Sequence, residues 1–333
     1  MYVSYRSATR CCSDRRSPDP LGGFMNRTAS STAILTPSDL DGGYAQLAHL
    51  HRTRAMDAFP VEWSRTGEDD FCVRAQWTST HPFFPPVSGN RYDPLLVAET
   101  FRQAALLVLH ASYGVPLDHK LLLSDLGYDC RMEHLVAEPG PTDVEVDVRF
   151  PVLKRRGGHL SYASIEFTLL RGGYEAATGL INTRMLSRPV YNRIRNGRTD
   201  DGCRAPEVPG IAPSIAGRAH DGDVLLAGTA QQNAWDLRVD TGHPTLFQRP
   251  NDHVPGMLLF EAGRQAAQAA CAPERFVATS GHIAFHQYVE FDAPCQIQVS
   301  PMVTTAGDRT ARILGSQGGE LAFVSNFAGS RRF

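Results

Sequence analysis

The sequence lacks any apolar run that would cross a membrane. Its longest apolar stretch, AALLVLHA at residues 104–111, is far shorter than the ~20 residues that a helical span needs. The N-terminal segment has no apolar stretch of the kind found in secretory leaders. The formal net charge is −2 over 333 residues, so there is no general basic field for nucleic acid. These absences predict a cytoplasmic protein that binds neither membranes nor nucleic acid.

Cysteine is scarce and follows no ligand pattern. The chain has seven cysteines and no C-x-x-C motif, and an odd number does not suit a disulfide framework. His49 with His51, and His282 with His286, have no third ligand at a diagnostic spacing. We therefore expect a reducing compartment, no metal site and no redox cofactor.

Residues 1–42 differ in composition from the rest of the chain. They are polar and Arg-rich, and no helical or strand period runs through them. This composition is typical of disorder. We predict a disordered N-terminal tail, with Met25 as a second candidate for the translation start.

An internal repeat organises the remaining chain. The segment THPFFPPVSGNRYDPLLVAETFRQAA (80–105) aligns without a gap to GHPTLFQRPNDHVPGMLLFEAGRQAA (242–267). Two copies at a long period indicate a duplicated domain. We predict a first repeat over 43–190, a linker rich in Pro, Gly and charge over 191–222, and a second repeat over 223–333. The offset is 162 residues, and it pairs His81 with His243, Glu99 with Glu261, Arg102 with Arg264 and Gln103 with Gln265.

Each repeat carries one long apolar helix and several strands. Alternation at 73–77 and 235–239 predicts a strand before the helix. The helix PLLVAETFRQAALLVLHA is apolar on nearly every face, so a strongly curved sheet must wrap it. This predicts an α+β fold, a tandem hotdog in which a curved antiparallel sheet wraps each central helix. Further strands are predicted at 128–137, 142–153, 160–170 and 175–186, and at 282–291, 295–305, 309–316 and 320–329.

The helix motifs resemble a known family. PGMLLFE (255–261), with Gln265 four residues later, resembles the helix start of hotdog β-hydroxyacyl-acyl-carrier-protein dehydratases. The duplication, the His-Pro pairs and E-x-x-R-Q-A-A in both copies resemble a narrower group, the A-factor biosynthesis hotdog family of γ-butyrolactone signal synthases. The resemblance covers roughly residues 50–330. It implies an acyltransferase without a cofactor that joins a β-ketoacyl chain, carried on an acyl carrier protein, to dihydroxyacetone phosphate.

One spacing departs from the dehydratase pattern. His243 lies 18 residues before Glu261, and Phe247 occupies the position of the catalytic dehydratase histidine. The alternatives left open are a dehydratase or thioesterase acting on acyl-carrier or CoA substrates, and a non-catalytic module that binds an acyl ligand or a carrier protein. Formation of a homodimer is also left open.

The Glu, Arg and Gln of each motif share one helical face, at i, i+3 and i+4. The helix dipole should favour the anion of Glu261 while burial should raise its pKa, so we predict a poised general base. Arg264 is predicted to hold an anion. Gly256 gives a thioester room at the helix start, which favours the second copy. The predicted catalytic residues are Glu261, Arg264 and Glu99, and the predicted substrate-binding residues are Arg102, Gly256, His243, His81, Gln265 and Gln103.

Structural readings of these residues are also considered. Glu and Arg at i, i+3 form ordinary ion pairs on many helices, and a buried pair can serve fold specificity. The glutamines can satisfy loop carbonyls. His253, beside the second helix start, has Arg91 rather than a histidine as its counterpart in the first copy.

Overall fold

The computed structural model describes residues 41–198, 205–300, 302–305 and 308–330. The predicted N-terminal tail lies almost entirely outside these residues. The strands are β1 (Gly42–Tyr44), β2 (Pro60–Arg65), β3 (Asp70–Thr78), β4 (Lys120–Cys130), β5 (Pro141–Arg156), β6 (His159–Arg171), β7 (Tyr174–Leu186), β8 (Leu226–Gly228), β9 (Ala234–Leu237), β10 (Val277–Phe285), β11 (Cys295–Val299), β12 (Val303–Thr305), β13 (Asp308–Gln317) and β14 (Glu320–Ser330).

Two long helices dominate, one in each repeat. Helix α1 is Pro94–Ala111 and helix α4 is Gly256–Cys271, and both are buried over most of their length. Two short helices, α2 (Arg188–Ile194) and α3 (Pro213–Ala216), lie in the connection between the repeats. None of the helices in the described ranges has both the length and the hydropathy of a membrane span.

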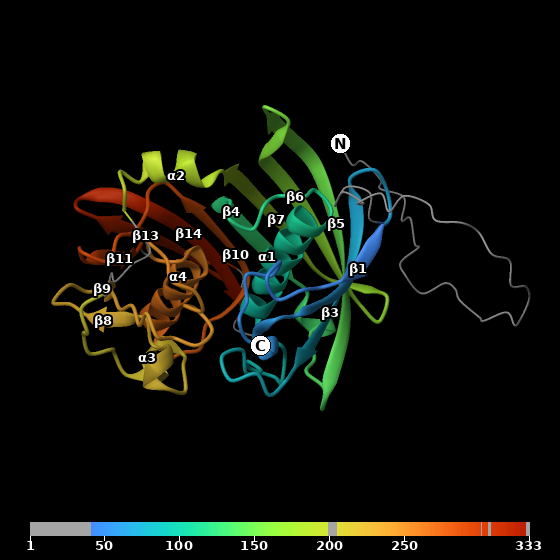
Figure 1. The fold of residues 1–333 in the computed structure, drawn as a ribbon. Helices are drawn as coiled ribbons and strands as arrows, with labels where there is room; N and C mark the ends of the chain where they lie inside the picture. The colour runs from blue at the N-terminus through green and yellow to red at the C-terminus, as the bar shows by residue number, and fades with distance from the viewer. Residues whose placement is uncertain (1–40, 199–204, 301, 306–307, 331–333) are drawn as a thin grey trace, which may run out of the picture.

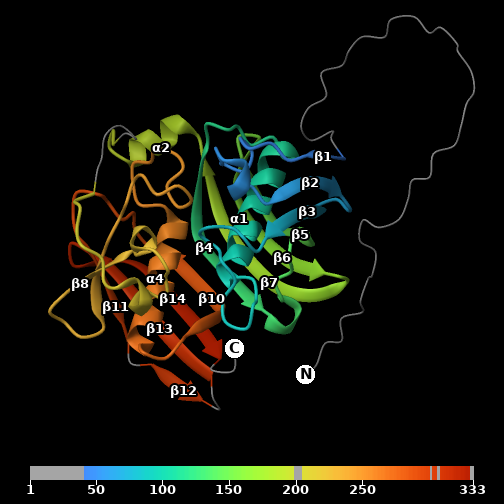
Figure 2. The same cartoon turned by 90° about the horizontal axis from the view of Figure 1, so that it is seen from below.

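The strands form one continuous sheet through both repeats. Its order is β1-β2-β3-β5-β6-β7-β4-β10-β14-β13-β11-β9-β8, with β12 paired to β13. The second repeat therefore presents its strands in the mirror order of the first, and the two halves join through the antiparallel pair β4–β10. Figure 2 shows β4 and β10 side by side where the two halves meet.

Each long helix lies against the curved sheet of its own repeat (Figure 1). Helix α1 contacts strands β2 to β5 and β7, whereas α4 contacts β8 to β11, β13 and β14. Because the sheets wrap the helices, apolar residues are needed around most of each helix circumference. The predicted α+β tandem hotdog is confirmed, and the exact repeat boundaries stay a prediction.

The predicted strand before each helix is present, and the register of its neighbour shows a second offset. Pro60 pairs with Ala75 across β2–β3, and Leu226 pairs with Leu237 across β8–β9. Ala75 and Leu237 differ by 162, whereas Pro60 and Leu226 differ by 166. The first hairpin is therefore four residues longer, and residues before it align at 166.

Two predicted strands were wrongly placed. Strand β4 begins at Lys120 rather than at 128, and β10 runs over Val277–Phe285 rather than 282–291. Residues 121–123 of β4 are consecutive leucines that face the large pocket described below. They therefore show no polar–apolar alternation, which is the signal that strand prediction uses.

Candidate active site

A glutamate in each long helix is surrounded by nitrogen donors. In α1, Arg102 Nη2 lies 2.7 Å from Glu99 Oε1, and Arg102 Nε lies 2.8 Å from Glu99 Oε2. Gln103 Nε2 donates to Glu99 Oε1 at 2.7 Å, and Arg52 forms a further ion pair with the same oxygen. The predicted helical face of Glu99, Arg102 and Gln103 is thus a connected cluster, with Arg52 as an added member.

Helix α4 repeats this cluster. Arg264 Nε donates to Glu261 Oε2 at 2.7 Å, and Gln265 Nε2 donates to Oε1 at 2.7 Å. Arg218 Nε lies 2.8 Å from Glu261 Oε1. We call the two groups Arg52–Glu99–Arg102 and Arg218–Glu261–Arg264 the first and second triads.

Arg52 and Arg218 were missed by the sequence analysis. Each also donates to a backbone carbonyl of the other repeat: Arg52 Nη1 to Thr245 O at 3.0 Å, and Arg218 Nη1 to Phe83 O at 2.8 Å. They therefore tie the repeats together. A signal was present, because R-x4-D occurs at Arg52–Asp57 and at Arg218–Asp223, at the offset of 166. It was hidden by the change of offset and by the assignment of Arg218 to a linker.

The glutamines satisfy backbone groups of the adjacent loops. Gln103 donates to Asp57 O at 2.7 Å and accepts from Phe59 N at 2.9 Å. Gln265 donates to Asp223 O and accepts from Leu225 N, both at 2.8 Å. These bonds support the structural reading of the glutamines.

The paired histidines are also built into loops. His81 Nε2 lies 3.3 Å from Asp57 Oδ1, and His243 Nε2 lies 3.1 Å from Asp223 Oδ1. The Nδ1 atom of each ring accepts backbone N–H groups two and three residues further on. Both rings are buried and outside the lining of the large pocket. Their predicted role in substrate binding therefore has no support from this position.

The glutamates are not the poised bases that the sequence suggested. Burial alone would raise the pKa of Glu99, but the guanidinium groups of Arg102 and Arg52, with hydrogen bonds from Arg102 and Gln103, hold it at about 2. The pKa of Glu261 is likewise lowered, because Arg218 and Arg264 outweigh its burial. A carboxylate with so low a pKa is a weak proton acceptor at neutral pH.

One large pocket, about 1360 Å³, lies between the two helices. Glu99 and Arg102 from the middle of α1 line it, together with Gly256 and Met257 from the start of α4. Glu261 and Arg264 do not belong to its wall. Arg264 and Gln265 instead line a second pocket of about 50 Å³. The two triads are thus alike in structure but unequal in access, and the open one is the first, not the favoured second.

The difference in access coincides with a substitution at the helix starts. Asp93 precedes α1, and its Oδ2 lies 3.4 Å from Nη2 of Arg264. Pro255 holds the equivalent position before α4 and, with Arg102, lines the large pocket. Asp93 therefore neutralises the arginine of the closed site. A proline leaves Arg102 without this carboxylate, and its Nη1 has no hydrogen-bond partner among the described residues.

The start of α4 offers backbone donors to the pocket. Asp93 caps α1 by accepting from Leu95 N at 2.9 Å, whereas Pro255 provides no side-chain cap for the described α4. The first N–H groups of a helix have no acceptor within the helix and carry partial positive charge. A Cβ on Gly256 would lie 3.0 Å from the Phe285 ring, so glycine keeps this end uncrowded.

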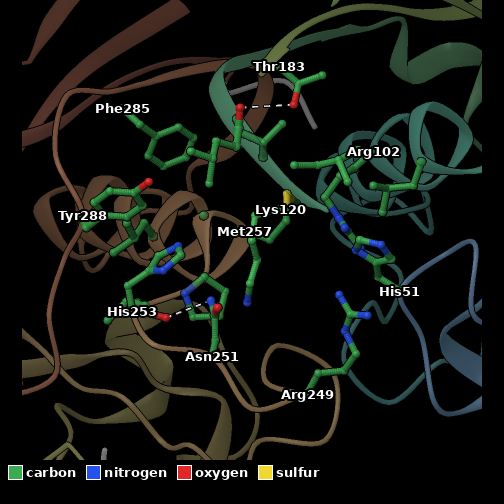
Figure 3. Close-up of a pocket in the computed structure, with 18 of the residues that line it drawn as sticks. His51, Arg102, Lys120, Thr183, Arg249, Asn251, His253, Met257, Phe285 and Tyr288 are labelled. Carbon is green, nitrogen blue, oxygen red and sulfur yellow. Dashed lines mark hydrogen bonds between the residues drawn. The ribbon is translucent and has the colours of Figure 1, made fainter. Parts of the chain in front are cut away.

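The pocket combines basic and apolar walls. Figure 3 shows Arg102 and Arg249 on one side of it, both beside His51. Burial, with nearby Arg249 and His110, lowers the pKa of His51 to about 2, so this ring is neutral at pH 7. Lys120 adds a further cation. The apolar part of the wall is formed by Leu95, Leu106, Leu109, Leu121, Met257, Leu259 and Phe285.

The first triad makes stability depend on pH. The pKa of Glu99 is lower in the folded protein than in the unfolded chain, so its ionised form stabilises the fold above about pH 4.5. We expect this contribution to be lost as pH falls from about 5 towards 2. Urea unfolding of the wild type and Glu99→Gln over this range should show a flatter pH dependence for the variant. Parallel pH curves would contradict this expectation.

Comparison with known proteins identifies the family. The A-factor biosynthesis hotdog domain matches residues 45–187 and 204–313, which is most of the chain and both repeats. The chain belongs to the A-factor biosynthesis hotdog family.

Relatives in the A-factor biosynthesis hotdog family match over nearly their full length. The chain is 48% identical to a 2-oxo-3-(phosphooxy)propyl 3-oxoalkanoate synthase of Streptomyces coelicolor, over 85% of this chain and 90% of that protein. It is 45% identical to a synthase of the same name from Streptomyces griseus, over 85% and 94%. Among solved structures, a 12:0-ACP thioesterase from Umbellularia californica has a TM-score of 0.45 and 11% identity, covering 77% of this chain and 96% of that one.

Proposed function

We propose that this chain is a 2-oxo-3-(phosphooxy)propyl 3-oxoalkanoate synthase. It transfers a 3-oxoalkanoyl (β-ketoacyl) group from an acyl-carrier-protein thioester to a hydroxyl of dihydroxyacetone phosphate. The product ester can close to a butenolide phosphate, a precursor of a γ-butyrolactone-type signal. The name and coverage of the relatives support this activity.

The observation that carries the proposal is the mixed chemistry of the large pocket. Its apolar side chains suit an acyl chain, and Arg102, Arg249 and Lys120 suit a phosphate. Arg102 has a guanidinium nitrogen to offer, because Glu99 takes only Nε and Nη2. An acyl chain and a phosphorylated acceptor can thus be held in one cavity.

The start of α4 suits the reacting carbonyl. Attack on a thioester places negative charge on the carbonyl oxygen, and preorganised N–H donors stabilise that charge. The uncapped first turn at Gly256 supplies such donors at the pocket wall. The sequence analysis predicted this role for Gly256, and the position supports it, although the partner triad is the first rather than the second.

The proposal is tested with purified protein, a 3-oxoacyl carrier-protein thioester and dihydroxyacetone phosphate. Mass spectrometry should detect the phosphorylated ester or its butenolide, and free carrier thiol should appear in equal amount. Thioester loss without dihydroxyacetone phosphate would instead indicate a thioesterase. Loss or gain of water on the acyl chain would indicate a dehydratase, and no reaction would indicate a binding module.

A further inference from the structure

A histidine and a carboxylate are paired where the chain enters α4. His253 Nδ1 lies 2.9 Å from Asp252 Oδ1, and the His253 ring lines the large pocket with 17% of its side chain exposed. Figure 3 shows His253 and Tyr288 across the pocket from Arg102 and His51. His253 is only three residues before Gly256, so the ring lies next to the helix start.

Asp252 is held firmly in place. Its side chain is 1% exposed. It accepts from Tyr191 Oη at 2.7 Å and from Arg195 Nε at 2.6 Å. Arg195 is fixed in turn by Glu290 at 2.7 Å. Burial would raise the pKa of Asp252, but hydrogen bonds from His253, Tyr191 and Arg195 hold it well below its usual range.

An ionised, immobile Asp252 determines the tautomer of His253. The carboxylate can only accept at this contact, so His253 Nδ1 carries the proton and donates it. Nε2 then keeps a lone pair, and it has no hydrogen-bond partner among the described residues. A ring oriented in this way is suited to take a proton from a bound molecule.

This pair is present beside the open pocket alone, as far as the described repeats show. The positions 162 residues earlier hold Asn90 and Arg91, and Arg91 donates to the carbonyls of Met132 and Gly89. The other candidates in the pocket are poorly suited to accept a proton. Glu99 is bound by two guanidinium groups, and His51 Nε2 lies 2.9 Å from a nitrogen of His110.

We propose that His253 is the general base of acyl transfer and that Asp252 is its positioning residue. This rests on the proposed function. His253 Nε2 takes the hydroxyl proton of dihydroxyacetone phosphate as that oxygen forms its bond to the thioester carbonyl carbon. The resulting oxyanion lies at the N–H groups of the first turn of α4. The carbon–sulfur bond then breaks, and the leaving thiolate takes the proton from Nε2.

The test compares two acceptors that differ in their need for a base. Dihydroxyacetone phosphate must lose a proton during attack, whereas hydroxylamine attacks as a neutral amine. His253→Ala is expected to lower kcat with dihydroxyacetone phosphate by about 100-fold or more, because a general base typically contributes 10²–10⁴. Hydroxamate formation should change by only a few-fold, and added imidazole should restore part of the ester formation. Asp252→Asn should likewise lower kcat for ester formation while the thioester KM and hydroxamate formation are retained.

His286→Ala is the matched control, because His286 is an exposed histidine on the same pocket. It is expected to leave both reactions unchanged. Undiminished ester formation by His253→Ala would overturn the proposal, and so would an equal loss with both acceptors, which would indicate a role in binding or folding. A wild-type protein that forms hydroxamate but no ester would overturn the proposed acceptor instead. A wild type inactive with both would overturn the proposed function as a whole.

Discussion

Glutamine in place of Glu261 is expected to lower the free energy of unfolding by about 3–5 kcal/mol. The substitution leaves Arg218, whose side chain is 4% exposed, and Arg264 around a neutral amide. Neither cation regains a carboxylate at that position, and Arg218 cannot recover its hydration without leaving the repeat interface. Urea denaturation followed by circular dichroism measures the change. Glu62→Gln is the control, because the Glu62–Arg74 pair is about 40% exposed and should contribute less than about 1 kcal/mol.

This substitution also decides the chemical role of Glu261, which stays a prediction. The buried triad and the small pocket beside it favour a structural role. Activity is measured per folded molecule, at a temperature where the variant remains folded. A variant with wild-type stability and no turnover would show that Glu261 acts in the reaction and that the structural assignment of the second triad is wrong.

Arg102→Gln is expected to reduce kcat/KM for dihydroxyacetone phosphate about 100-fold, which corresponds to about 3 kcal/mol. The variant loses the guanidinium that faces the pocket, whereas Glu99 keeps Arg52 and Gln103 as partners. The loss should therefore fall on phosphate binding. Unphosphorylated dihydroxyacetone separates the two effects, since its kcat/KM should change only a few-fold.

Arg312→Gln is the control for this measurement, because Arg312 is exposed on β13 and outside the pocket lining. It should leave both acceptors unaffected. An equal loss for the phosphorylated and unphosphorylated acceptors would show that Arg102 does not bind the phosphate. It would then indicate an effect on the carbonyl or on the position of Glu99.

Much of the fold was predictable because its signals are local. The repeat placed Glu99 and Glu261 on equivalent helices, and the apolar circumference of those helices required a curved sheet around each. The clusters with Arg and Gln then follow from i, i+3 and i+4 spacing. Strands β4 and β10 were misplaced because the pocket and the junction between the repeats change the pattern on which strand prediction depends.

The choice between the two sites was not predictable from either repeat alone. The open pocket combines the middle of α1 with the start of α4, so each wall belongs to a different repeat. The closing contact, Arg264 with Asp93, also crosses between repeats. Sequence analysis correctly singled out Gly256 but joined it to Glu261, its neighbour in the chain. In space its neighbours across the pocket are Glu99 and Arg102.

The fused, mirror-ordered sheet has an evolutionary consequence. In a symmetric dimer of identical subunits every mutation appears twice, so a residue that closes one site closes both. A single chain with two unequal copies is free of that constraint. Asp93 was able to become a permanent internal counter-ion on one side, while Pro255 and the Asp252–His253 pair arose on the other. Covalent duplication thereby allowed one ancestral site to specialise as scaffold and the other to keep the chemistry.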